Sequence, residues 1–179
     1  FTTKRTLKDI EASLVKIDTT ELGIEQLNAG EQLSAEYIDR RDITAADVKA
    51  YHIKGLWYFD KRQAEMKYRL LGIAPVAPDV NFIDSDTPDL VELFWVFFPD
   101  TREVLNEAMC FNNKNTATPI SFDHMLNSRR FSSNMYKEEN VYQDREIQEY
   151  IPNNALMQLL ESERIRTKIR DFELDQWQY

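Results

Sequence analysis

The sequence predicts a single compact α+β domain over residues 1–179, in which a small, mainly antiparallel sheet is covered by helices. Apolar residues alternate or run continuously between residues 49 and 98, whereas the segments on either side show helical spacing. A hydrophobic fraction of 42% in 179 residues is enough to form one core. We therefore expect residues 1–48 to be mainly helical, 49–98 to form the sheet and 99–179 to be mainly helical.

The amino-terminal part is predicted to begin with an amphipathic helix, because four apolar residues recur at helical spacing. They are Leu7, Ile10, Leu14 and Ile17. The stretch 18–30 is polar and holds two of the four glycines, so it predicts a loop. Thr44 and Asp47 have the spacing of a capping box, in which the threonine hydroxyl accepts a backbone N–H of the first helical turn. This pair predicts a short helix just before Lys49.

Three strands are predicted, at 49–59, 66–76 and 90–98. In the second, the even positions are apolar throughout and the odd positions become apolar from Leu71, so one face is buried along its length and the other partway. The third is apolar on both faces apart from Glu92, which is typical of a central strand, and the long loop before it favours antiparallel pairing. The residues assigned to the core are Trp57, Trp95 and Phe97.

Three helices are predicted in the carboxy-terminal part. Asp100 or Thr101 caps the first after Pro99, and Ser121 caps the second. The third spans 152–177 and has two apolar faces about half a turn apart, so it either breaks near its middle, at Ser162, or passes from one packing partner to another. These faces consist of Leu156, Leu159 and Leu160, and of Ile165, Ile169 and Phe172.

Composition excludes several classes of function. The formal net charge of −9 argues against nucleic-acid binding, which depends on Lys and Arg neutralising phosphates. No run of 18 apolar residues is present, so no membrane span is predicted. Cys110 is the only cysteine, so an internal disulfide is impossible.

An acidic cluster is the one candidate metal site. Asp84, Asp86 and Asp89 lie close together between two predicted strands, and such hard oxygen ligands could bind Ca²⁺ or serve a metal-dependent enzyme. The spacing and the closing glutamate of an EF-hand are missing. A solvated hairpin loop with Thr87 and Pro88 as turn residues explains the same segment, so we assign no metal.

No catalytic constellation is found. His52 and His124 are in no metal-ligand spacing, and Cys110 lies at the end of a predicted helix, where the helix dipole disfavours a thiolate. Ser121, Asp123 and His124 are almost adjacent in sequence, whereas the members of a triad come from different segments. Glycine-rich phosphate loops are also absent from the sequence. We therefore expect no catalytic residues and no cofactor.

A basic and aromatic segment stands out in this acidic chain. Residues 114–137 hold four Lys or Arg residues and one acid, Asp123. Arginine next to aromatic residues is typical of protein–protein contacts. The alternative is a solvated loop whose arginines form ion pairs with Glu138 and Glu139. The residues that we predict to bind a partner are Arg129, Arg130, Phe131 and Tyr136.

Several longer segments together match one known family. They are GLWYFDKR at 55–62, RLLGIAPV at 69–76, LFWVFFPD at 93–100 with Arg102, Leu105 and Asn106, Asp123 and Leu126 with Arg129-Arg130-Phe131, and LESERI at 160–165. In these segments the chain resembles the GldN/PorN family of gliding-motility and type IX secretion proteins of Bacteroidetes. The chain begins at Phe1 without the signal peptide of that family, so we expect it to be a fragment of a longer exported protein.

The resemblance implies a structural role. Members of the family are periplasmic and non-enzymatic, form large rings with an outer-membrane lipoprotein (PorK/GldK), and contact the periplasmic part of the inner-membrane motor subunit (PorM/GldM). No cofactor and no catalytic residue is implied. Two alternatives stay open at this point: a metal-dependent enzyme or Ca²⁺-binding domain using the acidic cluster, and an intracellular interaction module.

Overall fold

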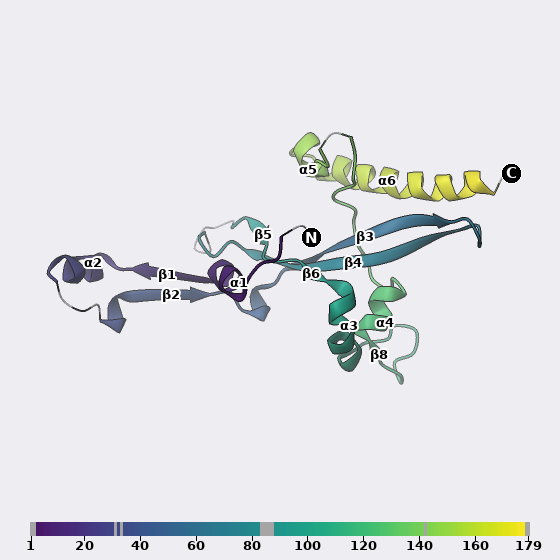
Figure 1. The fold of residues 1–179 in the computed structure, drawn as a ribbon. Helices are drawn as coiled ribbons and strands as arrows, with labels where there is room; N and C mark the ends of the chain where they lie inside the picture. Colours follow the sequence, from purple (N-terminus) through teal and green to yellow (C-terminus); the bar gives the residue numbers. More distant parts are fainter. Residues whose placement is uncertain (1–2, 31, 33, 83–87, 142, 178–179) are drawn as a thin grey trace. The chain divides into compact units, whose positions relative to one another are not determined.

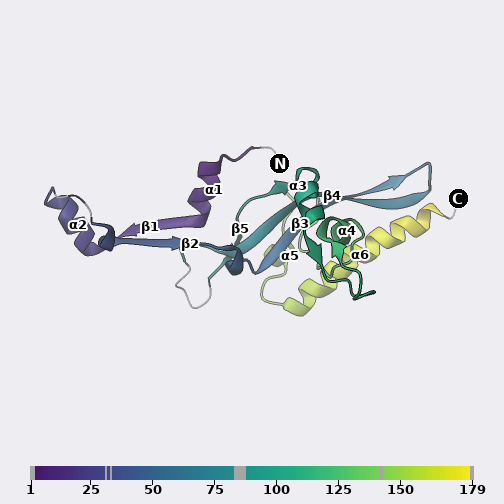
Figure 2. The same cartoon turned by 90° about the horizontal axis from the view of Figure 1, so that it is seen from below.

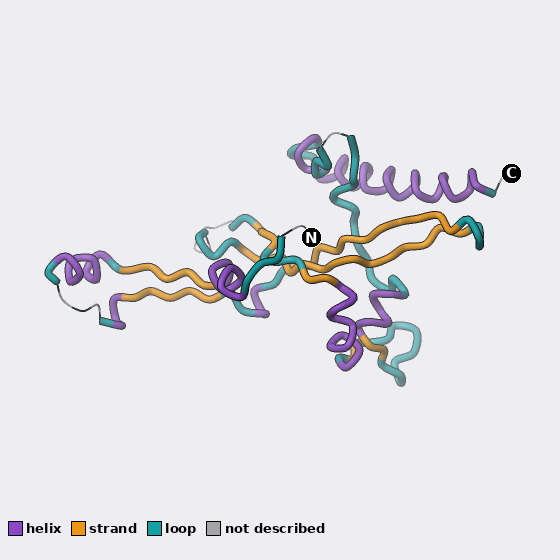
Figure 3. The backbone as a smooth tube through the Cα atoms, viewed as in Figure 1, coloured by secondary structure: helices purple, strands orange, loops and turns teal. Residues whose placement is uncertain are grey.

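The computed structural model describes residues 3–30, 32, 34–82, 88–141 and 143–177 (Figure 1). Its helices and antiparallel strands confirm the α+β class, as Figure 3 shows by element type. Contacts between residues gather in two compact units, which are described in turn. The first comprises Phe1–Gly55 and Leu70–Val104, and the second comprises Leu56–Arg69 and Leu105–Tyr179. The single domain over residues 1–179 therefore stays a prediction.

The first unit begins with a helix and a two-stranded ribbon. Helix α1 (Leu7–Leu14) is followed by β1 (Val15–Thr19), α2 (Glu21–Asn28) and β2 (Ile38–Asp42), and β1 pairs antiparallel with β2 (Figure 2). The prediction of a mainly helical segment was wrong at Ile17, which lies in β1. Pairing with a strand some twenty residues away prevails here over the local helical spacing. The predicted loop at 18–30 was wrong as well, because it contains α2.

Both amino-terminal caps follow the chemistry of a capping box. At α1, Thr6 N–H donates to Asp9 Oδ2 over 2.8 Å, and Asp9 N–H donates back to Thr6 Oγ1 over 3.3 Å. The box predicted at Thr44 and Asp47 is confirmed, with Thr44 N–H donating to Asp47 Oδ2 over 2.8 Å. It starts only a single 3₁₀ turn, η2 (Ala45–Asp47), rather than an α-helix.

The main sheet is built on a long hairpin. Strands β3 (Ala50–Asp60) and β4 (Glu65–Pro78) confirm the first two predicted strands, and β5 (Leu90–Glu92) and β6 (Val96–Phe97) both pair antiparallel with β4. The even positions of β4 from Leu70 to Val76 are buried, as predicted. The buried residues Ala77, Val80, Leu93 and Ile43 form the core cluster of this unit.

The third predicted strand was wrong in its continuity and in its central position, because among the described strands β5 and β6 pair only with β4, at the edge away from β3. Val76 pairs with Glu92 but Ile73 pairs with Val96, so the register shifts by one residue between β5 and β6. The break between β5 and β6 lies opposite Pro75, which has no N–H to donate to the neighbouring strand. The Pro75 carbonyl accepts from Leu93 N–H over 3.1 Å. Phe97 has 45% of its surface exposed, so its assignment to the core was also wrong.

Helix α3 (Phe98–Glu107) begins earlier than predicted, and its residues from Leu105 onward belong to the second unit. The predicted cap at Asp100 or Thr101 was wrong, because both residues lie inside the helix. The Thr101 hydroxyl donates to the Phe98 carbonyl over 2.8 Å.

The second unit contains short elements and one long helix. Strands β7 (Met109–Cys110) and β8 (Ile120–Ser121) pair antiparallel, and α4 (Phe122–Asn127) and α5 (Ile147–Tyr150) precede α6 (Ala155–Gln176). The cap predicted at Ser121 is confirmed, because its Oγ accepts from His124 N–H over 3.2 Å.

Helix α6 runs without a break, so the predicted break near Ser162 was wrong. Ser162 is buried and its Oγ accepts from Met135 N–H over 2.8 Å, and Ile165 is buried one turn further on. The first apolar face, in contrast, is exposed. Its members are Leu156, Leu159 and Leu160.

Candidate functional site

The basic segment predicted from the sequence lines a groove in the second unit. We call this surface, with a volume of about 510 Å³, the basic groove. Three cations, several apolar side chains and three small polar residues surround it. The lining residues are Phe111, Asn112, Asn113, Lys114, Ile120, Met125, Arg129, Arg130, Phe131 and Ser132.

One wall of the groove is a loop held in place by an amide. Asn112, which is 9% exposed, donates from Nδ2 to the Thr118 carbonyl over 2.9 Å and accepts at Oδ1 from Lys114 N–H over 3.1 Å. These two bonds close the chain between β7 and β8 on itself. The loop backbone that carries Lys114 is therefore held in place by the Asn112 side chain.

The opposite wall is the turn that ends α4. Arg130 N–H donates to the Met125 carbonyl over 3.0 Å and Arg129 N–H donates to the Leu126 carbonyl over 3.2 Å, which is the bond pattern of a Schellman motif. Arg129 occupies the left-handed position with φ of 52°, where glycine is usual. The side chain of Arg129 has a specific contact.

That contact is an aromatic stack on the β3–β4 hairpin. The guanidinium carbon of Arg129 lies 4.7 Å from the ring centre of Trp57 and 5.7 Å from that of Tyr68. The two rings are themselves 5.1 Å apart, and Trp57 is half-buried. Burial raises the pKa of Tyr68, and the nearby positive charge of Arg129 opposes that rise. Arg129 therefore joins the turn after α4 to the hairpin of the same unit.

The other cations of the groove face solvent. Within the described residues, neither Lys114 nor Arg130 has a hydrogen-bond or ion-pair partner for its side chain, and both are exposed. Phe111 is 72% exposed at the edge, and Phe131 is half-buried. All the lining residues are described, and none of them is an Asp or Glu. The groove thus combines free positive charge with apolar surface.

The structure brings three of the four predicted partner residues together in this groove, namely Arg129, Arg130 and Phe131. Tyr136 lies outside the lining. It is half-buried, and its carbonyl accepts from Ile147 N–H over 2.8 Å. Lys114 was visible in the count of basic residues, whereas no sequence signal marked Phe111.

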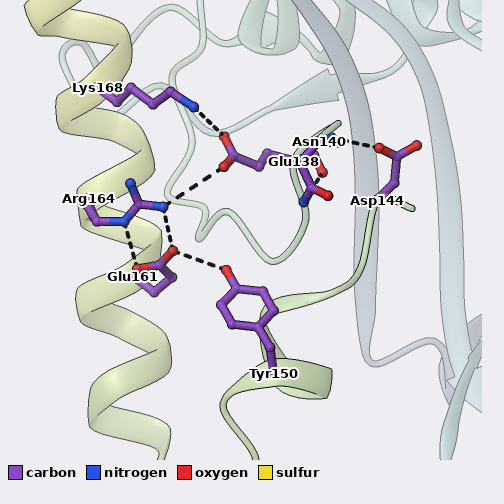
Figure 4. Close-up of polar contacts among 7 residues, drawn as sticks. All are labelled: Glu138, Asn140, Asp144, Tyr150, Glu161, Arg164 and Lys168. Atoms are coloured by element: carbon purple, nitrogen blue, oxygen red, sulfur yellow. Dashed lines mark hydrogen bonds and ion pairs between the residues drawn. The ribbon is translucent and has the colours of Figure 1, made fainter. Parts of the chain in front are cut away.

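Of the two acids proposed as intramolecular partners of these arginines, Glu138 makes other contacts, and the Glu139 side chain has no hydrogen-bond or ion-pair partner among the described residues. Glu138 lies 3.6 Å from Lys168 Nζ and 4.0 Å from Arg164 Nη2, both on α6 (Figure 4). Arg164 also bonds Glu161 over 2.6 Å, and Tyr150 donates to Glu161 over 3.2 Å. The Arg164 bond is the main reason why the pKa of Glu161 is lowered, and burial is the main reason why that of Tyr150 is raised.

The remaining candidate residues do not converge. Asp84 and Asp86 lie outside the described residues, and Asp89 is exposed with its carbonyl accepting from Asp79 N–H over 3.0 Å. In the described part of the chain no three His, Cys, Asp or Glu side chains are placed to hold a metal ion.

The two histidines and the cysteine have structural neighbours. His52 Nδ1 lies 2.6 Å from Glu92 Oε1, and Glu92 Oε2 accepts from Trp95 Nε1 over 2.7 Å. The backbone N–H of His124 donates to the Ser121 cap of α4. The prediction that Cys110 lies at the end of a helix was wrong, because it lies in β7, where its half-buried Sγ is 3.8 Å from Met125 Sδ.

Comparison with known proteins gives one match. The family model described as gliding motility associated protein GldN matches residues 1–178. No curated protein and no solved structure matches the chain. Among the described residues, no helix has the length and apolar character needed to cross a membrane.

Proposed function

The chain belongs to the GldN family of gliding-motility-associated proteins, which makes it a component of the gliding and type IX secretion machinery, and on that premise we propose that it is a non-enzymatic structural part of this machinery in the periplasm. In this proposal it forms rings with an outer-membrane lipoprotein of the PorK/GldK type and contacts the motor subunit PorM/GldM. The observation that carries the proposal is the match of the family over residues 1–178.

The basic groove supports a role in binding rather than in chemistry. Arginine and aromatic side chains supply much of the binding energy at protein interfaces, because they bury a large area and pair with carboxylates in a defined geometry. Arg130 and Phe131 present both properties side by side at one surface. We therefore place a partner contact of the proposed assembly at this groove, with Tyr136 as a further candidate beyond its lining.

Charge reversal at the groove tests this placement. The double variant Arg129→Glu/Arg130→Glu in the full-length protein is expected to reduce recovery of the lipoprotein or motor partner in a pull-down by at least about tenfold. A matched control is Lys61→Glu/Arg62→Glu, which reverses two adjacent exposed cations in the turn of the β3–β4 hairpin. Circular dichroism of both variants shows whether the fold survives.

The pull-down decides whether the basic groove takes part in the proposed function. Selective loss of either partner in the groove variant supports the placement. Equal recovery of both partners by the wild type, the groove variant and the control removes the groove from the proposed function.

Fractionation tests the proposed location. The full-length protein in its native cell is expected in the envelope fraction, together with the lipoprotein partner. Recovery in the cytosol would contradict the periplasmic role and favour an intracellular interaction module.

A further inference from the structure

We propose that the basic groove binds an acidic, extended segment of a partner protein that carries one apolar anchor side chain. The inference rests on the proposed function, because it names the kind of segment that this surface recognises. It commits to a protein segment, and binding of another polyanion is treated below as a competing outcome.

The first argument is charge complementarity. The groove carries Lys114, Arg129 and Arg130 without an acid in its lining, in a chain whose formal net charge is −9. An acidic segment is repelled by the net charge of such a molecule and attracted by these three cations. Complementary charge of this kind contributes mainly to specificity and to the rate of association. The preferred ligand is therefore negatively charged but short enough to lie within the groove.

The second argument is the apolar part of the lining. Ile120 and Met125 are half-buried beside Phe131, and Phe111 is largely exposed at the edge. The groove, with a volume of about 510 Å³, is open to solvent rather than enclosed. Purely anionic ligands would leave these apolar side chains in water. A Phe or Leu side chain of the bound segment would cover them and gain the free energy of burial.

The third argument assigns different roles to the three cations. Arg129 stacks on Trp57 and Tyr68, so it acts as a positioning residue that holds the turn against the hairpin. Arg130 and Lys114 have no side-chain partner among the described residues, so they are the groups available to bind carboxylates. Arg130 can form two parallel bonds to one carboxylate, whereas Lys114 acts as a point charge.

Peptide binding to the full-length protein tests the inference. The probe is a fluorescein-labelled peptide of about a dozen residues, made of Asp, Glu and Ser around a central Phe, and binding is followed by fluorescence anisotropy. One comparison peptide replaces the Phe with Ser, and another replaces every acid with its amide. Each is expected to bind at least about tenfold more weakly, because each lacks one of the two features.

Variants locate the site. Arg130→Glu and Lys114→Glu are each expected to weaken the acidic Phe peptide by about tenfold, whereas the control Arg62→Glu should leave its affinity unchanged. Arg129→Lys keeps the charge and loses the planar stack. It should weaken the peptide only about two- to fivefold while changing the tryptophan emission, which Arg130→Lys should not change.

Several outcomes would overturn the inference. They are equal affinity for the Phe and Ser peptides, equal affinity of Arg130→Glu and the wild type, and tighter binding of inorganic polyphosphate or of phosphatidylglycerol vesicles than of the acidic Phe peptide. A lost pull-down with no peptide binding would refute the inference and leave the proposed function. Peptide binding with an unchanged pull-down would support the inference and refute the role of the groove in the proposed function.

Discussion

Ser162 lies in the middle of α6, where a serine is a weaker helix former than alanine. Its side chain is nevertheless nearly excluded from solvent, with 4% exposed, and its Oγ accepts the backbone N–H of Met135. This bond holds the chain that follows the basic groove against the helix. One hydroxyl thus provides the acceptor for the N–H group of the half-buried Met135.

Replacing this hydroxyl has two opposing effects. Ser162→Ala leaves the Met135 N–H without its acceptor, which costs about 1–3 kcal/mol, and gains about 0.5 kcal/mol in helix propensity. We expect a net loss of about 1 kcal/mol in the free energy of unfolding, measured by urea denaturation. The exposed Ser133→Ala is the matched control and should change it by less than about 0.5 kcal/mol. Equal stability of the two variants would show that the buried bond contributes nothing.

Glu161 gives a prediction about pH. Its pKa is lowered, mainly by the hydrogen bonds from Arg164, so the folded state favours the carboxylate. This stabilisation is present above the ordinary pKa of a glutamate and is lost as the pH falls through the lowered folded value. Glu161→Gln should therefore be less stable than the wild type at neutral pH, by at most about 1 kcal/mol at this partly exposed site.

The pH series supplies the check on Glu161. The difference between Glu161→Gln and the wild type should shrink as the pH falls through the lowered pKa of the folded state, because the glutamate then becomes protonated in both folded and unfolded chains. Glu163→Gln removes the same charge at a more exposed ion pair with Arg166 and serves as the control. If the difference in the free energy of unfolding persists unchanged in acid, the shape of the Glu161 side chain, and not its charge, stabilises the fold.

At the scale of elements, the caps decide how the groove is built. Helix α4 has only six residues, and isolated helices of that length are unstable in water. Its Ser121 cap therefore contributes a large share of what holds Met125 and the turn at Arg129 in place. The same helix provides one wall of the groove, so the cap links local stability to binding.

Removing the cap tests this link. Ser121→Ala should lower the free energy of unfolding by about 1 kcal/mol, because a first-turn N–H of α4 loses its acceptor. It should also weaken the acidic Phe peptide, because the turn that carries Arg130 loses its support. Ser121→Thr keeps a hydroxyl that can cap and should recover most of both losses. If peptide binding stays intact in Ser121→Ala, the groove does not depend on this cap.

The elements also show where sequence patterns are informative. Alternation predicted β3 and β4 correctly, because half-buried strands of a hairpin impose that period on the chain. The apolar run at 90–98 hides a register shift that depends on Pro75 in another strand, so no property of the run itself reveals it. Likewise, the pairing of β1 with β2 is non-local and was missed.

The candidate site, like the fold, could be predicted from the sequence only in part. Arg129, Arg130, Phe131 and Lys114 stood out because basic residues are locally dense in an acidic sequence. The stack of Arg129 on Trp57 and Tyr68 joins segments about sixty to seventy residues apart, which no local signal connects. Sequence therefore located the surface, and the structure separated the residue that positions the turn from those free to bind.

At the scale of the whole molecule, apolar exposure and net charge act in opposite directions. Among the described residues, twenty-five large hydrophobic side chains are exposed and eleven hydrophobic residues are buried. Exposed apolar side chains of this kind, such as those of Leu156 and Leu160 on α6, favour association when they form continuous patches. The formal net charge of −9 opposes association of identical copies.

Salt separates these two contributions, and this gives the last prediction. Added salt screens the repulsion between copies, since the Debye length falls from about 10 Å at 0.1 M to about 3 Å at 1 M, whereas burial of apolar surface is not screened. Self-association of the full-length protein should therefore increase between about 0.05 M and 0.5 M NaCl in sedimentation velocity. Binding of the acidic Phe peptide should weaken over the same range, because its attraction to Arg130 and Lys114 is screened. Self-association that decreased with salt would instead mean that charge pairs hold the copies together, and would exclude the apolar faces as the main contact of the proposed rings.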